Sequence, residues 1–133
     1  MNVEVARKVE QVILRFWRDL DRRDYTAMIA SLTADCRWLR EGWIEGHAAI
    51  AESLMRRPGD LLTRHLITNI VIDAQGGDLI ASHLVTTFAG QAMTNAAPLP
   101  AAAPVLIADV ELTLVQAEGQ WRISRIEPTI MFR

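Results

Sequence analysis

The sequence predicts an α+β fold, with helices in the first half of the chain and antiparallel strands in the second. Apolar residues recur at intervals of three and four near the N-terminus, and at intervals of two from Thr63 onward. Short glycine-containing segments, typical of turns, separate the later apolar segments. Helices followed by a run of strands are typical of α+β domains. The 133 residues suit one domain, spanning residues 1–133.

The longest predicted helix, residues 3–23, opens the chain. Its apolar side chains form one stripe: Val5, Val9, Val12, Ile13, Phe16 and Leu20. A narrower shoulder of the same helix carries Leu14, Trp17 and Asp21, so Asp21 borders an apolar flank near the helix end. Asp24 is placed to cap a short second helix.

Shorter elements follow in the middle of the chain. Residues 36–40 predict a short strand, and Gly42 interrupts it before residues 43–44 resume an extended segment. Residues 47–57 predict a third helix, which ends at Pro58–Gly59.

Four longer strands are predicted in the second half, at about residues 63–73, 79–91, 105–116 and 120–132. Gly76–Gly77 and Glu118–Gly119 are typical of hairpin turns. The Ala- and Pro-rich segment Met93–Pro104 predicts a long irregular connection. A curved sheet of this kind needs helices folded over one face, and incomplete filling leaves a pocket.

Composition and charge exclude several classes of function. The formal net charge is only −2, which gives no support to nucleic-acid binding. The uncharged, Ala-rich stretch of residues 96–108 contains three prolines and is too short to span a membrane. The single cysteine, Cys36, cannot form an internal disulfide and is expected to be a buried structural thiol. We therefore expect a cytoplasmic protein with no membrane partner.

Histidine and carboxylate side chains are the candidates for chemistry. Alternation along the first long strand places on one face Thr63, His65, Ile67, Asn69 and Val71. A neutral imidazole there acts as base or acid near pH 7, although a histidine packed in the core fits the pattern equally. Asp21 is a candidate partner, whereas Asp109 and Glu111 also fit the solvent face of a sheet or a subunit contact. No metal-ligand spacing or nucleotide-binding motif occurs, so we expect no metal and no cofactor.

The order of these elements resembles the SnoaL-like branch of the nuclear transport factor 2-like superfamily. The segments that carry the resemblance are Leu20–Tyr25, Asp35–Trp38, Gly46–Ile50, Arg64–Ile70 and Gly119–Ile123. The resemblance implies a cystatin-like α+β fold, in which a strongly curved sheet wraps around the N-terminal helices as a cone-shaped barrel. It also implies a deep pocket for a small-molecule ligand and a homodimer formed through the outer face of the sheet.

Within that branch, the chain is similar to scytalone dehydratase and related cofactor-free dehydratases. The catalytic aspartate and histidine of that subgroup fall on Asp21 and His65. A second catalytic histidine falls near Ala89, and a water-binding tyrosine is replaced by Arg40. A pocket asparagine of the subgroup falls near Val110. The proton-transfer pair is thus present, while the rest of the site departs from the subgroup.

The β subunits of aromatic-ring-hydroxylating dioxygenases have similar motifs, and those subunits are mainly structural. The same Asp21 and His65 therefore occur in a catalytic and a structural subgroup. The leading hypothesis is cofactor-free proton transfer on a small apolar cyclic or aromatic molecule, as in dehydration or isomerisation. A non-catalytic ligand-binding module and a structural subunit remain as alternatives. The residues expected to line the pocket are Trp38, Arg40, Asn69, His83 and Val110.

Overall fold

The computed structural model describes residues 1–92 and 98–133. Helices come first: α1 (Val3–Arg22), α2 (Tyr25–Ala30) and, after two strands, α3 (His47–Met55). The six strands are β1 (Leu32–Leu39), β2 (Trp43–Glu45), β3 (Leu61–Gln75), β4 (Asp78–Gln91), β5 (Leu106–Ala117) and β6 (Gln120–Phe132). The α+β class predicted from the sequence is confirmed.

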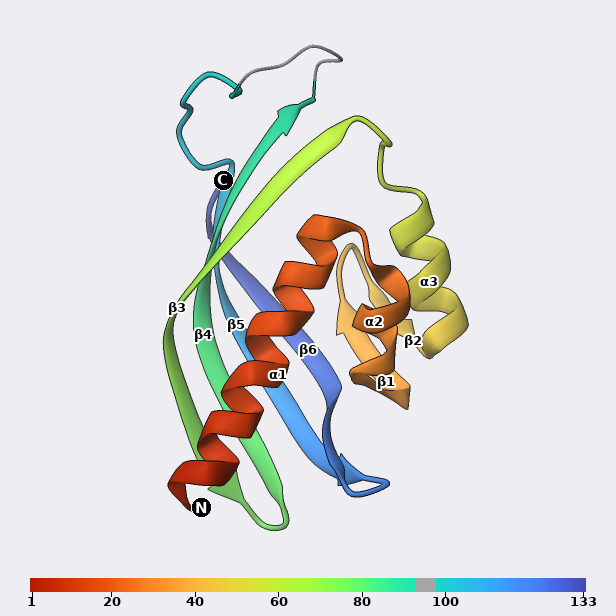
Figure 1. Ribbon diagram of the computed structural model, residues 1–133, viewed down its shortest axis with the longest axis vertical. Coiled ribbons are helices and arrows are strands. Elements are labelled where there is room, and N and C mark those ends of the chain that lie inside the picture. The colour runs from red at the N-terminus through yellow and green to blue at the C-terminus, as the bar shows by residue number, and fades with distance from the viewer. Residues whose placement is uncertain (93–97) are drawn as a thin grey trace.

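One mixed sheet contains all six strands, in the order β2-β1-β6-β5-β4-β3. Neighbouring strands are antiparallel except β1 and β6, which are parallel. The sheet is strongly curved, as predicted, but it remains open between its edge strands β2 and β3 (Figure 1). Left-handed backbone at Gly76 and Gly119 forms the two predicted hairpin turns between long strands.

The core lies between α1 and the face of the sheet that it covers, which we call the inner face (Figure 1). The buried residues of α1 are Val9, Ile13, Phe16, Trp17 and Leu20. They pack over alternate strand residues, which include Ala81, Val85, Ala108, Val110 and Leu112. The other face of the sheet, the outer face, carries the residues between them, which include Ser82, Asp109 and Glu111. None of the helices in the described ranges is long and apolar enough to cross a membrane.

Several boundaries differ by one or two residues from the sequence prediction, and the start of β1 differs by four. Strand β1 begins at Leu32, not at residue 36, because Leu32 pairs in parallel with Ile123 of the distant β6. Helix α3 ends at Met55, two residues before the predicted end. The predicted irregular connection Met93–Pro104 falls partly outside the described residues, and its described part, 98–104, contains no helix or strand.

A β-bulge interrupts the alternation of β3. Thr68 pairs with Leu84 and Val71 with Ser82, so two residues of β3 oppose one residue of β4. Asn69 has a positive φ of 59°, a conformation that asparagine tolerates better than most residues. As a result Ile70 packs against the core, and Val71 is 54% exposed. The prediction that Asn69 and Val71 share the face of His65 is wrong.

Candidate functional site

Asp21 and His65 form a hydrogen-bonded pair where the end of α1 meets β3. The Nδ1 atom of His65 lies 2.6 Å from Oδ1 of Asp21, and the His65 backbone N–H donates to Oδ2 at 2.9 Å. Their side chains keep only 11% and 9% of their surface exposed. The carboxylate therefore fixes both the ring and the backbone of the histidine that faces it.

The charge on this pair follows from its hydrogen bonds. Burial alone would raise the pKa of the Asp21 carboxyl, but hydrogen bonds from the His65 ring, the His65 backbone and Thr63 outweigh it and hold that pKa below its usual value. An ionised Asp21 accepts a hydrogen bond from a protonated Nδ1 of His65. In the neutral imidazole the other nitrogen, Nε2, then carries the lone pair and can accept a proton. Among the described residues Nε2 of His65 has no hydrogen-bond partner, so this atom is free to take a proton.

Thr63 and Arg57 extend the pair into a longer chain of hydrogen bonds. The Thr63 hydroxyl donates to Oδ1 of Asp21 at 2.9 Å and accepts from the Arg57 guanidinium at 3.0 Å. Arg57 also donates to the Leu20 carbonyl at 3.1 Å and to the Tyr25 hydroxyl at 2.9 Å. One guanidinium thus connects the ends of α1, α2 and α3 to the strand that carries His65.

Sequence reasoning missed Arg57 and Thr63 as members of this site. Arg57 stands directly before Pro58–Gly59, where a basic residue after a helix is usually explained by the helix dipole. Thr63 shares the predicted face of His65, two residues away, and this spacing was the available signal.

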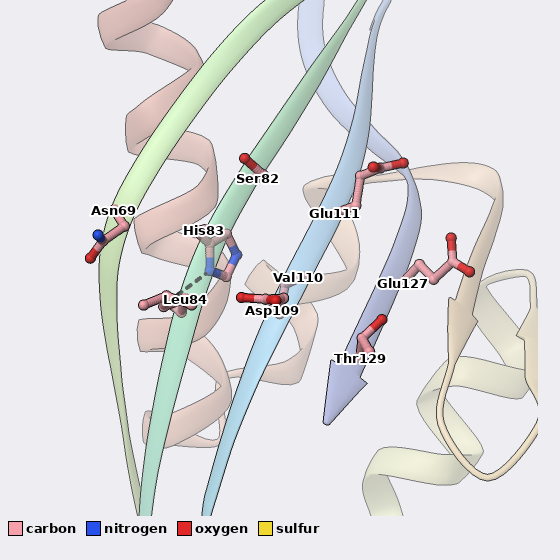
Figure 2. A pocket seen from close by; sticks show the side chains of 9 residues that line it. All are labelled: Asn69, Ser82, His83, Leu84, Asp109, Val110, Glu111, Glu127 and Thr129. Atoms are coloured by element: carbon pink, nitrogen blue, oxygen red, sulfur yellow. Dashed lines mark hydrogen bonds between the residues drawn. The ribbon is translucent and has the colours of Figure 1, made fainter. Parts of the chain in front are cut away.

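Trp17 joins the two histidines of the inner face. Its ring centroid lies 5.2 Å from that of His65, and its Nε1–H donates to Nε2 of His83 at 3.2 Å. Nδ1 of His83 donates to the Leu84 carbonyl at 3.0 Å, so both ring nitrogens are used. Burial lowers the pKa of His83, which is 3% exposed. His83 is therefore a neutral core residue that holds Trp17, and it also borders the hollow of about 600 Å³ beside Asn69, on the side of the sheet away from Asp21 (Figure 2).

The remaining predicted pocket residues are divided among different surroundings. Trp38 is 4% exposed and packs edge-on against Phe16, with ring centroids 5.4 Å apart. The guanidinium of Arg40 lies over the Trp38 ring at 4.9 Å, beside a hollow of about 550 Å³. Val110 is buried in the core opposite His83.

Asn69 lies on the outer face, away from the Asp21–His65 pair. It borders a hollow of about 600 Å³ whose side chains include Ser82, Asp109, Glu111 and Glu127. Figure 2 shows these residues on the strands with α1 behind the sheet. Asp109 and Glu111 thus lie exposed on the outer face of the sheet, on the side away from Asp21.

The remaining candidates for chemistry are the single cysteine and groups of side chains that could bind a metal ion. Cys36 is fully buried. Burial, and to a smaller extent the negative charge of the nearby Asp35, raise the pKa of its thiol to about 12. It is the buried thiol that the sequence predicted. Within residues 1–92 and 98–133, no group of three or more His, Cys, Asp or Glu side chains is arranged to hold a metal ion.

The chain matches a known protein family over most of its length. The family model described as a SnoaL-like domain matches residues 1–127. A comparison with curated proteins finds no match.

Solved structures with the same fold include three informative examples. A candidate scytalone dehydratase from Novosphingobium aromaticivorans is 20% identical, with a TM-score of 0.81 over 98% of this chain and 87% of that chain. A candidate aromatic ring hydroxylase from the same organism is 13% identical, with a TM-score of 0.82 over 100% and 93%. A Nostoc punctiforme protein of unknown function with a cystatin-like fold is 15% identical, with a TM-score of 0.80 over 98% and 94%. At these identities the likeness establishes the cystatin-like fold.

Proposed function

The chain belongs to the SnoaL-like family, and from this premise we propose that it binds a small apolar cyclic or aromatic molecule and catalyses cofactor-free proton transfer on it. The observation that carries the proposal is the buried hydrogen bond between Asp21 and Nδ1 of His65. The reaction class is dehydration or isomerisation next to a carbonyl group. Similarity to a candidate scytalone dehydratase supports the same class.

The proton moves through Nε2 of His65. The neutral imidazole takes a proton from the carbon next to the substrate carbonyl, and the electron pair of the C–H bond moves into an enolate. In a dehydration the imidazolium then returns that proton to the departing hydroxyl group, which leaves as water. In an isomerisation it returns the proton to another carbon, so His65 ends each cycle neutral.

Asp21 makes this cycle energetically accessible without touching the substrate. Its carboxylate holds the Nδ1–H tautomer and stabilises the imidazolium that forms after proton removal. Acid–base catalysis by a positioned histidine contributes roughly 10²–10⁴-fold in rate.

Exchange of substrate protons in heavy water tests this proposal directly. A thermal-shift screen of cyclic ketones, hydroxy-ketones and aromatic polyketides first selects compounds that bind, because binding raises the melting temperature. NMR then follows deuterium incorporation next to the carbonyl. We expect His65→Gln to slow exchange roughly 10²–10⁴-fold and Asp21→Asn to slow it less. Ser82→Ala, on the exposed outer face, is the control.

The outcomes separate the alternatives. Compounds that bind the wild-type protein and its His65→Gln variant equally, without exchange or turnover, would indicate a non-catalytic ligand-binding module. A screen without any binding compound would favour a structural subunit, in keeping with the likeness to a candidate ring hydroxylase. Either result would overturn the catalytic proposal.

A further inference from the structure

Two arginines without carboxylate partners flank the hollow between the β1–β2 turn, the end of α3 and the start of β3. The hollow holds about 550 Å³, within the range of small-molecule sites. Three arginines, Arg40, Arg56 and Arg57, and one carboxylate, Glu41, line it, with Ser53 and Leu61 among the remaining residues. Among the described residues, neither Arg40 nor Arg57 has a carboxylate within ion-pair distance, whereas Arg56 is paired with Glu52 at 2.9 Å.

The hydrogen bonds of these arginines leave donors unused. Arg57 donates to three neutral oxygens: the Leu20 carbonyl, the Tyr25 hydroxyl and the Thr63 hydroxyl. Arg40 donates only to the Ser53 hydroxyl among the described residues, at 3.4 Å. Since a guanidinium carries five N–H donors, both groups retain donors for a ligand.

The two positive charges also act on each other. Desolvation and then the proximity of Arg57 lower the pKa of Arg40, and the nearby Glu41 offsets this only partly. Trp38 beneath the Arg40 guanidinium restricts its orientation. An anion placed between the two arginines would relieve their repulsion and accept charge-assisted hydrogen bonds from both.

We propose that this hollow binds a carboxylate group of the ligand, so that the substrate of the Asp21–His65 site is a cyclic or aromatic organic acid. Arg57 links the hollow to the pair, because the same guanidinium lines the hollow and donates to Thr63, which donates to Asp21. Every second residue of β3 lies on its inner face, so Leu61, Thr63 and His65 lead in order from the hollow to the Asp21–His65 pair. This inference rests on the proposed function, because it names the substrate class of that same site.

Matched neutral and charged probes test the proposal. Isothermal titration calorimetry compares 2-naphthoate with its uncharged amide, 2-naphthamide, on the folded full-length chain. We expect 2-naphthoate to bind at least tenfold more tightly, and high salt to reduce the difference. NMR of the arginine side chains should show the Nε–H signals of Arg40 and Arg57 shifting with 2-naphthoate and remaining in place with the amide.

Variants locate the effect. Arg40→Met should remove most of the preference for 2-naphthoate, and Arg40→Lys should retain part of it. Arg37→Met is a matched control, because Arg37 also lies over a tryptophan ring, that of Trp43 at 4.4 Å, but belongs to β1 and does not itself line the hollow. We expect this control to change the affinity less than threefold.

Equal binding of the two probes, absence of 2-naphthoate binding at 10 mM, or an unchanged preference in Arg40→Met would overturn the carboxylate site. The catalytic proposal fails separately, when His65→Gln leaves turnover unchanged. The two failures are therefore distinguishable by experiment.

Discussion

Trp17 donates its indole N–H to Nε2 of His83 across the core, at 3.2 Å. This hydrogen bond requires an unprotonated Nε2, and the Leu84 carbonyl accepts from the other ring nitrogen. The same indole packs against His65, with ring centroids 5.2 Å apart. A structural histidine and a candidate catalytic histidine thus share one neighbour, and the first of them keeps that neighbour in place.

Lowering the pH should destabilise the fold through His83. Its pKa is lowered by burial in the folded chain, so below the ordinary histidine pKa of about 6.5 the unfolded chain takes up a proton that the folded chain refuses. The contribution of His83 to the free energy of unfolding is fully present above about pH 6.5, and it is lost as the pH falls toward the pKa of His83 in the folded chain. Urea unfolding between pH 8 and 5 should show the loss, at most about 1.4 kcal/mol per pH unit from one proton. His83→Gln should weaken this dependence, and an unchanged slope in that variant would contradict the assignment.

Replacing Trp17 by Phe should destabilise the protein by about 1–3 kcal/mol, because Nε2 of His83 would be left buried without a donor. The free energy of unfolding from urea titration measures this effect. Trp43→Phe is the matched control, since Trp43 is 38% exposed at the sheet edge and should cost less. Equal losses from the two substitutions would argue against a structural role for the Trp17–His83 bond.

Replacing Thr63 by Val should raise the pKa of Asp21. The Thr63 hydroxyl donates to the Asp21 carboxylate and lowers that pKa, and valine has nearly the same shape without the hydroxyl. Carbon-13 NMR of the Asp21 carboxyl during an acid titration measures the shift. Thr63→Ser keeps the hydroxyl and should stay close to the wild-type value. A titration of Thr63→Val that overlays the wild type would exclude the hydroxyl as a determinant.

The outer face of the sheet should pair with a second copy of the chain. Leu66 and Val71 lie on this face, 48% and 54% exposed, where apolar surface favours association. Analytical ultracentrifugation should find a dimer, and the double substitution Leu66→Glu and Val71→Glu should reduce it to a monomer. Met55→Glu, at a 75% exposed position on α3, should leave the dimer intact. A monomeric wild-type protein would contradict this expectation.

Local signals were sufficient to predict most of the fold. The apolar stripe of α1, the glycine turns and the two-residue alternation of the later strands each depend on neighbours in sequence. The first four residues of β1 were missed because Leu32 gains its strand partner from Ile123, far along the chain. The bulge at Asn69 was missed because strict alternation was assumed, although asparagine within a run of β-branched residues is itself a sign of irregular backbone.

The candidate site was only partly predictable. Periodicity placed Asp21 beside an apolar flank and His65 inside a strand, but their pairing rested on the family resemblance. The chain from Arg57 through Thr63 to Asp21 depends on how α3 meets β3, which no local pattern describes. His83 appeared available for chemistry because its donor, Trp17, lies 66 positions away in sequence.

The bulge at Asn69 divides β3 into two segments whose side chains alternate independently. Before it, odd-numbered residues such as His65 face α1, and after it even-numbered residues such as Ile72 do so. A one-residue deletion in the hairpin after Asn69 can be absorbed by the bulge, whereas a deletion between Leu61 and His65 would turn the imidazole toward the solvent. Length variation among related chains should therefore be tolerated at the hairpin end of β3 and rejected at the end that carries the histidine.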